Sequence, residues 1–315
     1  MKFSLDYNPA PSAEKFGYNN RAMLIGSCFA ENIGDMLVKH RFETLVNPAG
    51  ILFNPLSIAD TIMRGLKGTE LAEHFFVERE GKFLSYAHHS SVAANSKEEL
   101  KKVIRWLDRS TSEFLKQGDF LFITLGSAFA YVLSEHSVPV ANCHKQPSAF
   151  FRKELLPLSA VVEALAETIS QIQEINSGLQ VVISVSPVKY LRDGLVNNNR
   201  SKAILLLAAH ELAEKFSNVQ YFPAYELVTD DLRDYRFFKE DLAHPNSQAV
   251  NYVWEKFAST FFSEKTQEIV KEVHKLNLLM EHRLLHNDAA ARAKHLAIIT
   301  QLQDKITQLE PHIRF

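Results

Sequence analysis

The chain alternates short, almost uninterrupted apolar runs with amphipathic segments, and this alternation limits its possible folds more than any other feature. The runs end at Gly, Pro or polar turn residues, and apolar residues at helical spacing follow them. A strand that is covered on both faces appears in the sequence as a continuous apolar run. Strands alternating with helices form a parallel sheet with right-handed crossovers. The sequence therefore predicts a doubly wound α/β fold with core strands at 22–25, 42–46, 120–125, 181–185 and 219–222.

Helices and insertions complete this expected pattern. We expect helices over 158–175 and 201–215, a further helix that begins near Asn246, and a hairpin inserted around Glu80-Gly81. From about residue 264 onward the strand signal ends, and leucine-rich stripes predict two helices broken near His286-Asn287-Asp288. We therefore expect an α/β domain at 1–262 and a helical hairpin at 263–315, which packs on the core or on a second subunit in a homo-oligomer.

The charge balance and composition argue against several classes of protein. The chain has 35 Lys and Arg residues and 37 Asp and Glu residues, which is a nearly neutral balance. A dedicated nucleic-acid binder normally carries a basic patch or stripe, so this class is not expected. No run of about 18 apolar residues and no apolar signal-peptide core occurs, so we expect no membrane contact and a cytoplasmic location. Two cysteines, Cys28 and Cys143, suggest neither a disulfide framework nor a zinc site. We expect no metal and no cofactor.

Polar residues that follow the strands are the first candidates for chemistry, because ligands of doubly wound sheets bind beyond the carboxyl ends of the strands. Gly26-Ser27-Cys28 follows the first strand at a helix start. A helix N-terminus favours a thiolate, and its N–H groups can receive an oxyanion. The alternative is that Ser27 caps the helix and Cys28 is a small buried side chain.

Asp241 and His244 form the second candidate, three residues apart before Pro245 and the last core helix. At this spacing a carboxylate can hold the imidazole in one tautomer while the other ring nitrogen acts as a base. An ordinary helix cap or surface pair is the alternative. If the dyad is real, the Cys28 sulfur should lie within about 4 Å of a His244 ring nitrogen.

Taken together, these segments resemble the GSCFA family of the SGNH (GDSL-like) hydrolase superfamily. Gly26-Ser27-Cys28-Phe29-Ala30 is the motif that names the family, and Asp241-x-x-His244 follows downstream. The resemblance covers about residues 20–262. It implies a flavodoxin-like, three-layer α/β/α fold with a nucleophile after the first strand and a His–Asp pair near the C-terminus. Overlaying the superfamily motif puts Cys28 at the nucleophile position, with Ser27 as the alternative.

The oxyanion donors that the resemblance implies are less well matched. The superfamily uses a glycine N–H after the second strand, where Gly50 or Asn54 stands, and an Asn side chain after the third. Here Gly126-Ser127-Ala128 has Ala128 in place of that Asn, and Asn142 is the nearest downstream substitute. Losing one oxyanion donor can lower the catalytic rate by ~10²–10³, so weak or altered catalytic activity is one expectation.

Other polar residues rank lower as site candidates. His144 and Lys145 could bind an anionic substrate, and His89 could line the site. Ser201-Lys202 follows a run of Asn residues and looks like a helix-start cluster, with substrate contact as the alternative.

Three functions fit these observations. The first is hydrolysis of acyl esters of small molecules or acetylated carbohydrates through an acyl-enzyme on Cys28 or Ser27. The second is acyl transfer by the same site. The third is a catalytically degenerate binding or structural protein. The substrate class rests on analogy at the level of the fold.

Overall fold

A computed structural model of the chain describes residues 5–282 and 289–315. Five parallel strands form the central sheet, in the order β10-β9-β5-β1-β2. Numbered among themselves along the chain, they run 2-1-3-4-5, the flavodoxin-like order. The predicted fold class is confirmed. The strands are β1 (Arg21–Gly26), β2 (Glu43–Val46), β5 (Phe120–Leu125), β9 (Gln180–Val185) and β10 (Val219–Tyr221).

The strand register brings the carboxyl ends of the three inner strands together. Gly26 of β1 lies opposite Thr124 of β5, and Thr124 lies opposite Ser184 of β9. The segments that continue from these strands therefore leave the sheet side by side at one edge. This is the edge at which doubly wound folds bind ligands.

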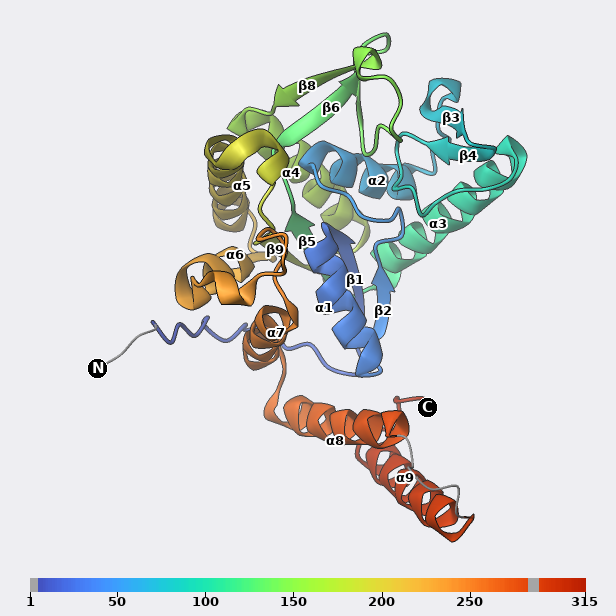
Figure 1. Cartoon of the computed structure of the whole chain (residues 1–315), viewed down its shortest axis with the longest axis vertical. Coiled ribbons are helices and arrows are strands. Elements are labelled where there is room, and N and C mark those ends of the chain that lie inside the picture. Colours follow the sequence, from blue (N-terminus) through green and yellow to red (C-terminus); the bar gives the residue numbers. More distant parts are fainter. Residues whose placement is uncertain (1–4, 283–288) are drawn as a thin grey trace.

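Helices cover both faces of the sheet (Figure 1). They are α1 (Cys28–Lys39), α2 (Pro55–Lys67), α3 (Lys97–Gln117), α4 (Leu158–Ile175), α5 (Gly194–Lys215), α6 (Ala224–Glu226) and α7 (Ser247–Phe261). Alternate residues of β1 face opposite ways: Met23 and Ile25 enter the core shared with α2, α4 and α5, whereas Ala22 and Leu24 enter the core shared with α1 and α7. This two-sided burial explains the continuous apolar runs in the sequence.

The helix predictions are confirmed for α4 and α7 but not for the start of α5. This helix begins at Gly194, not near residue 201. The Asn residues that suggested a cap lie inside the helix, where buried Asn198 accepts a hydrogen bond from the N–H of Tyr190 at 2.8 Å. Ser201 and Lys202 are therefore interior helix residues and not a cap.

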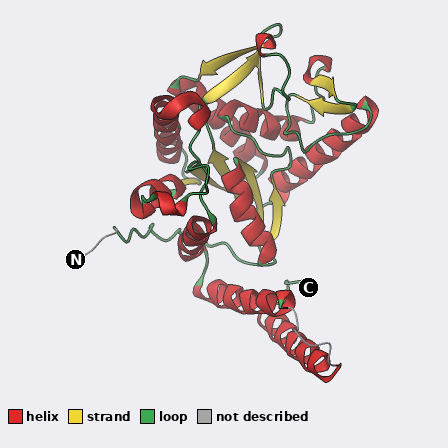
Figure 2. Ribbon diagram, in the orientation of Figure 1, coloured by secondary structure: helices red, strands yellow, loops and turns green. Residues whose placement is uncertain are grey.

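Two antiparallel insertions stand apart from the central sheet (Figure 2). The predicted hairpin is formed by β3 (Phe76–Arg79) and β4 (Lys82–Ser85), with positive φ at both turn residues, Glu80 and Gly81. A second, unpredicted sheet contains β6 (Phe129–Leu133), β7 (Val138–Val140) and β8 (Phe151–Leu155) in the order β7-β6-β8. Its sequence signal is weak because β8 is largely exposed and β7 contains a proline.

The C-terminal helices α8 (Glu264–Glu281) and α9 (Ala289–Leu309) form the predicted hairpin and project from one end of the molecule (Figure 1). The predicted break at His286–Asp288 lies outside the described residues. Buried side chains of both helices join the core on the α1 and α7 side of the sheet. No helix in the described ranges is long and apolar enough to span a membrane.

Candidate active site

The junction between β1 and α1 is built on a glycine that no other residue can replace without strain. Gly26 has φ +136°, and a Cβ there would lie 2.1 Å from the carbonyl oxygen of Thr124. Its N–H donates to Asn47 Oδ1 at 2.9 Å, and its carbonyl accepts from the N–H of Leu52 at 2.8 Å. The close approach to β5 and the bonds to the segment after β2 fix where the next two residues lie.

Ser27 is the N-cap of α1. Its Oγ accepts a hydrogen bond from the N–H of Phe29 at 3.2 Å, and its own N–H donates to the carbonyl of Thr124 at 3.1 Å. Its side chain is buried, with 1% of the residue exposed. The hydroxyl is therefore engaged in capping, as the alternative interpretation of the sequence held for Ser27.

Cys28 is the first residue of α1 and a half-buried free thiol. Burial is the largest influence on this thiol and raises its pKa, and the nearby carboxylate of Glu31 adds to the rise. A hydrogen bond from the backbone N–H of Cys28 itself and the positive charges of Lys202 and Lys239 oppose this effect. The sequence predicted a thiolate favoured by the helix N-terminus. In the free protein desolvation outweighs that effect, so the resting side chain is a neutral thiol.

Asp241 and His244 form the predicted pair. Asp241 Oδ2 accepts a hydrogen bond from His244 Nδ1 at 2.7 Å, while Oδ1 accepts from the backbone N–H groups of Ala243 and His244, each at 2.9 Å. A left-handed φ of +56° at Leu242 shapes the turn that allows all three bonds. The N–H of His244, that of Ala243 and then the His244 ring lower the pKa of Asp241. The pair therefore presents an ionised carboxylate on Nδ1 and leaves Nε2 without a hydrogen-bond partner among the described residues.

The segments that carry the thiol and the imidazole converge on the same edge of the sheet. The N–H of Lys189, after β9, donates to the carbonyl of Ala243, and the N–H of Lys239 donates to the carbonyl of His244 at 2.7 Å. The charge of Lys239 is felt at the Cys28 thiol. No hydrogen bond joins that thiol to His244 in the described part of the chain. Catalytic hydrogen bonds are often long before substrate binds.

Two of the predicted oxyanion donors, Gly50 and Asn54, are already engaged by the fold, as is Gly126 of the third block. The N–H of Gly50 donates to the carbonyl of Asn47 at 2.7 Å, and that of Gly126 donates to the carbonyl of Phe53 at 2.9 Å. Asn54 caps α2 through Oδ1, and its Nδ2 donates to Ser57 Oγ and to the carbonyl of Val140. The free protein therefore presents none of these groups as an open donor.

Asn142 and His144 belong to a hydrogen-bonded cluster on the insertions. Asn142 Nδ2 donates to Ser90 Oγ, and its Oδ1 accepts from the N–H of His144. His144 Nε2 donates to the carbonyl of Ser85 at 2.8 Å, and Nδ1 contacts Ser90 Oγ at 3.2 Å. Burial lowers the pKa of His144. His144 is thus a neutral, internally bonded side chain and not a cation that faces an anionic substrate.

His89 and Lys145 are next to Ser90 and His144 of this cluster in the chain. The structure brings His89 against Gly50, where a Cβ on the glycine would lie 2.4 Å from the Cβ of His89. His89 Nδ1 accepts from the N–H of Ser91. Lys145 is exposed, with a left-handed φ of +55°.

Lys202 is the residue whose importance the sequence did not reveal. Its ammonium group is buried on α5 and donates to the carbonyls of Gly126 and Ser186, both at 2.7 Å. A lysine on a helix face shared with Leu205, Ala209 and Leu212 was the available signal, because these three are core residues.

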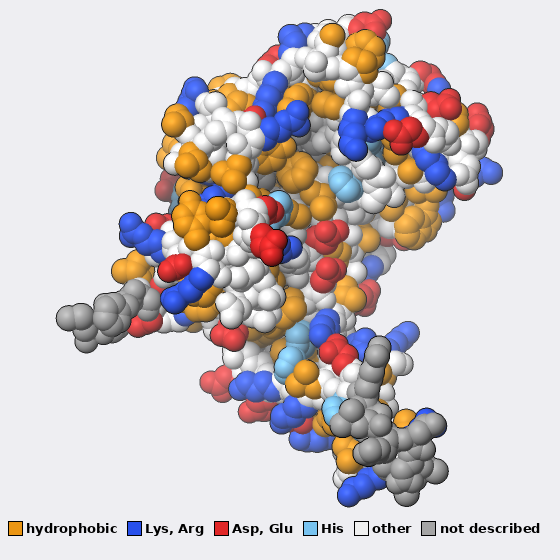
Figure 3. Space-filling model, viewed as in Figure 1, with side chains coloured by type: hydrophobic (Ala, Val, Ile, Leu, Met, Phe, Trp, Pro, Cys, Tyr) orange, Lys and Arg blue, Asp and Glu red, His pale blue; other side chains and the backbone are white. Residues whose placement is uncertain are grey.

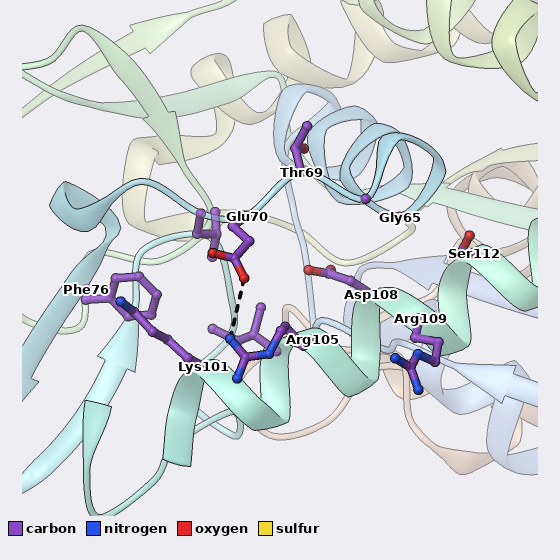
Figure 4. A pocket seen from close by; sticks show the side chains of 12 residues that line it. Gly65, Thr69, Glu70, Phe76, Lys101, Arg105, Asp108, Arg109 and Ser112 are labelled. Atoms are coloured by element: carbon purple, nitrogen blue, oxygen red, sulfur yellow. Dashed lines mark hydrogen bonds and ion pairs between the residues drawn. The ribbon is translucent and has the colours of Figure 1, made fainter. Parts of the chain in front are cut away.

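Four cavities in the described part of the chain are lined by other residues than the predicted site residues. One of about 260 Å³ lies between the C-terminal end of α2 and α3, where Arg105 pairs with Glu70 beside Phe76 and Lys101 (Figure 4).

Basic and acidic side chains are interspersed over the face shown in Figure 3. Within residues 5–282 and 289–315, no group of three or more His, Cys, Asp or Glu side chains is placed to hold a metal ion.

Comparison with known proteins gives one family match. The sequence profile of the GSCFA family matches residues 21–257. No curated protein matches the chain.

Two solved structures share a distant likeness. A Bacteroides fragilis protein, provisionally named an acylhydrolase, has a TM-score of 0.41 at 7% identity over 84% of this chain and 90% of its own. A carbohydrate esterase family 3 protein from Talaromyces cellulolyticus has a TM-score of 0.38 at 7% identity over 81% of this chain and 99% of its own.

Proposed function

The chain belongs to the GSCFA family, and from that premise we propose that it hydrolyses acyl esters through a thioester on Cys28. One observation carries the proposal. Asp241 accepts a hydrogen bond from His244 Nδ1 at 2.7 Å, which leaves Nε2 available. Lys239, on the same segment, is close enough for its positive charge to lower the pKa of the Cys28 thiol. A thiol, an oriented imidazole and a carboxylate are the parts that acyl transfer requires.

The environment of Ser27 favours Cys28 as the nucleophile. The Ser27 hydroxyl accepts the capping hydrogen bond of α1 and is buried. Attack by Ser27 would break the cap and would require its side chain to turn outward. Cys28 needs neither change, and a thiol is the more nucleophilic group at neutral pH.

The proposed reaction moves one proton through His244 in each half. Nε2 of neutral His244 takes the thiol proton as the sulfur attacks the ester carbonyl carbon, giving a tetrahedral oxyanion. The C–O bond to the leaving group breaks, and the alkoxide takes the proton from His244 to leave as an alcohol. Water then attacks the thioester and gives a proton to His244. The C–S bond breaks, the acid is released, and the thiolate recovers its proton.

The oxyanion relies on the first turn of α1. The Cys28 N–H lies in the first turn of α1 beside its own sulfur and is the donor that we propose for the oxyanion of an acyl group on that sulfur. The N–H groups of Gly50 and Gly126 are engaged elsewhere. With donors missing, each of which contributes ~10²–10³ in rate in well-equipped enzymes, we expect slow turnover.

The substrate that we propose is an acyl ester of a small molecule or carbohydrate. An acyl group on Cys28 can pass to an acceptor hydroxyl by the same steps in place of water. Acyl transfer is therefore tested together with hydrolysis, by adding candidate sugar acceptors to the assay and separating acylated acceptor from free acid.

The test compares four single variants with the wild-type protein on p-nitrophenyl acetate. We expect Cys28→Ala and His244→Ala each to lower turnover by about 10²-fold or more. We expect Ser27→Ala to keep turnover while destabilising α1. The matched control is Cys143→Ala, which removes the other free, half-buried thiol and should leave turnover unchanged. Intact mass should show one acetyl group on wild type and none on Cys28→Ala.

Two results would count against this proposal in different ways. Loss of turnover in Ser27→Ala with full turnover in Cys28→Ala would move the nucleophile to Ser27. Equal, thiol-independent rates in all variants would favour the binding or structural alternative.

A further inference from the structure

Lys202 is buried without an acidic partner, and such a group needs an explanation. Only 2% of the residue is exposed, and no carboxylate pairs with it in the described part of the chain. Removing an ammonium ion from water is unfavourable unless charges and hydrogen bonds compensate. An apolar side chain would fill the same space among Leu205 and Ala209 without that cost.

The hydrogen bonds of Lys202 tie together two segments at the carboxyl edge of the sheet. Gly126 directly follows β5 and Ser186 directly follows β9, and the ammonium group donates to both carbonyls at 2.7 Å. Thr124, two residues before Gly126, accepts the N–H of Ser27. The ammonium ion therefore lies within the framework that carries Cys28, and its third N–H has no acceptor among the described residues.

The charge of Lys202 acts on the Cys28 thiol. Burial lowers the pKa of Lys202 to about 7, and among the described residues the charge of Cys28 opposes this effect. At the thiol, Lys202 and Lys239 lower the pKa, whereas burial and Glu31 raise it. Lys239 is exposed and its effect is screened by salt, but the effect of buried Lys202 is not.

We propose that Lys202 is a positioning residue for the Cys28 thiolate. The buried ammonium ion of Lys202 fixes the carbonyls after β5 and β9 and stabilises the negative sulfur from within the fold. This inference rests on the proposed role of Cys28 as nucleophile. It explains how a thiol in a desolvating site can be ionised when His244 takes its proton. If the two neutral carbonyls were its only partners, a neutral hydrogen-bond donor would bind them equally well.

The charge of Lys202 also sets an alkaline limit. The ammonium ion is present below its pKa and is lost as pH rises through about 7, so its support for the thiolate weakens on the alkaline side. Arginine stays charged over this range. We therefore expect kcat/KM of wild type to fall relative to Lys202→Arg as pH increases from 7 to 9.

The main test measures alkylation of Cys28 by iodoacetamide from pH 6 to 9 in a Cys143→Ala background, with thermal unfolding to verify the fold. In Lys202→Met we expect alkylation of Cys28 to be about tenfold slower at pH 6, where wild-type Lys202 is charged, and this difference to shrink toward pH 9 as the wild-type ammonium ion loses its proton. Lys202→Arg should retain most of the wild-type rate. The matched control Lys239→Met removes an exposed lysine, and its smaller effect should vanish in about 0.5 M salt. A folded Lys202→Met protein with the wild-type titration would overturn the inference.

A second measurement keeps Lys202 in place and does not depend on how the variants fold. Iodoacetate leaves a negative carboxymethyl group on Cys28, whereas iodoacetamide leaves a neutral one. Because coupling between two sites is reciprocal, the Lys202 pKa should be about one unit higher in the carboxymethylated protein. NMR of ¹³C-labelled lysine side chains, assigned by the signal missing in Lys202→Arg, measures this pKa. Equal titration midpoints in the two forms would refute the coupling.

The proposed function and this inference fail in different ways. Full esterase activity in Cys28→Ala would reject the nucleophile and leave the thiol titrations as measured. If Cys28→Ala is inactive but the titrations of Cys28 and Lys202 are unchanged, only the role proposed for Lys202 is rejected.

Discussion

At the scale of single residues, the candidate site depends on positions whose side chains are already committed. Ser27 caps α1 and Asn54 caps α2. The N–H of Gly50 closes a turn, and that of Gly126 donates to the carbonyl of Phe53, just before α2. What remains for chemistry is a thiol, one imidazole nitrogen and a buried ammonium ion. The same short motif therefore builds the strand–helix junction and supplies the nucleophile that we propose.

The first residue-scale prediction concerns Gly26→Ala. A Cβ here would lie 2.1 Å from the Thr124 carbonyl at a φ of +136°, so both sterics and backbone strain oppose it. We expect a loss of about 3 kcal/mol in the free energy of unfolding, measured in urea. The control is Gly81→Ala, which also has positive φ but nothing within 4 Å of the added Cβ, and should cost about 1 kcal/mol. Equal losses would mean that the close approach to β5 is not the constraint.

At the scale of elements, the ends of the helices determine the shape of the site. α1 begins where β1 ends, so its first turn and Cys28 lie at the edge of the sheet. The loop after β9 is held to the Asp241–His244 turn by the bond from Lys189 to Ala243. Lys202 of α5 donates to the carbonyls of Gly126, after β5, and Ser186, after β9.

The element-scale prediction concerns the cap of α2. Asn54→Ala removes the bond to the N–H of Ser57 and the bond to the carbonyl of Val140 in β7, both in a buried setting. We expect the free energy of unfolding to drop by about 2 kcal/mol, because a cap is lost and the buried Val140 carbonyl loses a donor. Ser96→Ala, at the N-cap of α3 beside exposed Glu99, is the control and should cost about 1 kcal/mol. Urea titration of both variants decides whether Asn54 joins the second insertion to α2.

At the scale of the whole molecule, the C-terminal helices complete one of the two cores. His40 after α1 stacks on Trp254 of α7 at 5.1 Å and on His274 of α8 at 6.0 Å between ring centroids. Ile269 and Val273 of α8 are buried with Phe261 and Phe262. We propose that residues 263–315 are an appendage to the α/β domain of residues 1–262 that depends on it for its core.

The pH dependence of stability belongs to this scale. Burial lowers the pKa of His40, and also those of His88 and His144, below their unfolded values. The unfolded chain then binds more protons than the folded one as pH falls below about 6.5, so acid favours unfolding. We expect the Tm to decrease from pH 7.5 to pH 5 and this decrease to be smaller in His40→Gln. A variant with the wild-type pH slope would show that His40 has the same pKa in the folded and unfolded states.

Local pattern determined much of this protein. The apolar runs identified all five central strands, Gly26-Ser27-Cys28 marked the first turn of α1, and the Asp241–His244 spacing predicted the bond that the structure contains. These features depend on residues close in the chain, or on burial that every inner strand shares. Their information is therefore present in short stretches of sequence.

The tertiary structure alone decided the remainder. Lys202 lies 76 residues from Gly126 and 16 from Ser186 along the chain, and nothing near it in the sequence shows that its ammonium ion is buried between them. Likewise, Asn54 is bonded to β7, 86 residues away, which takes it out of the set of open donors. Whether a polar side chain faces substrate, caps a helix or is buried depends on which distant segments surround it, because burial and hydrogen-bond partners are set only when the chain closes on itself.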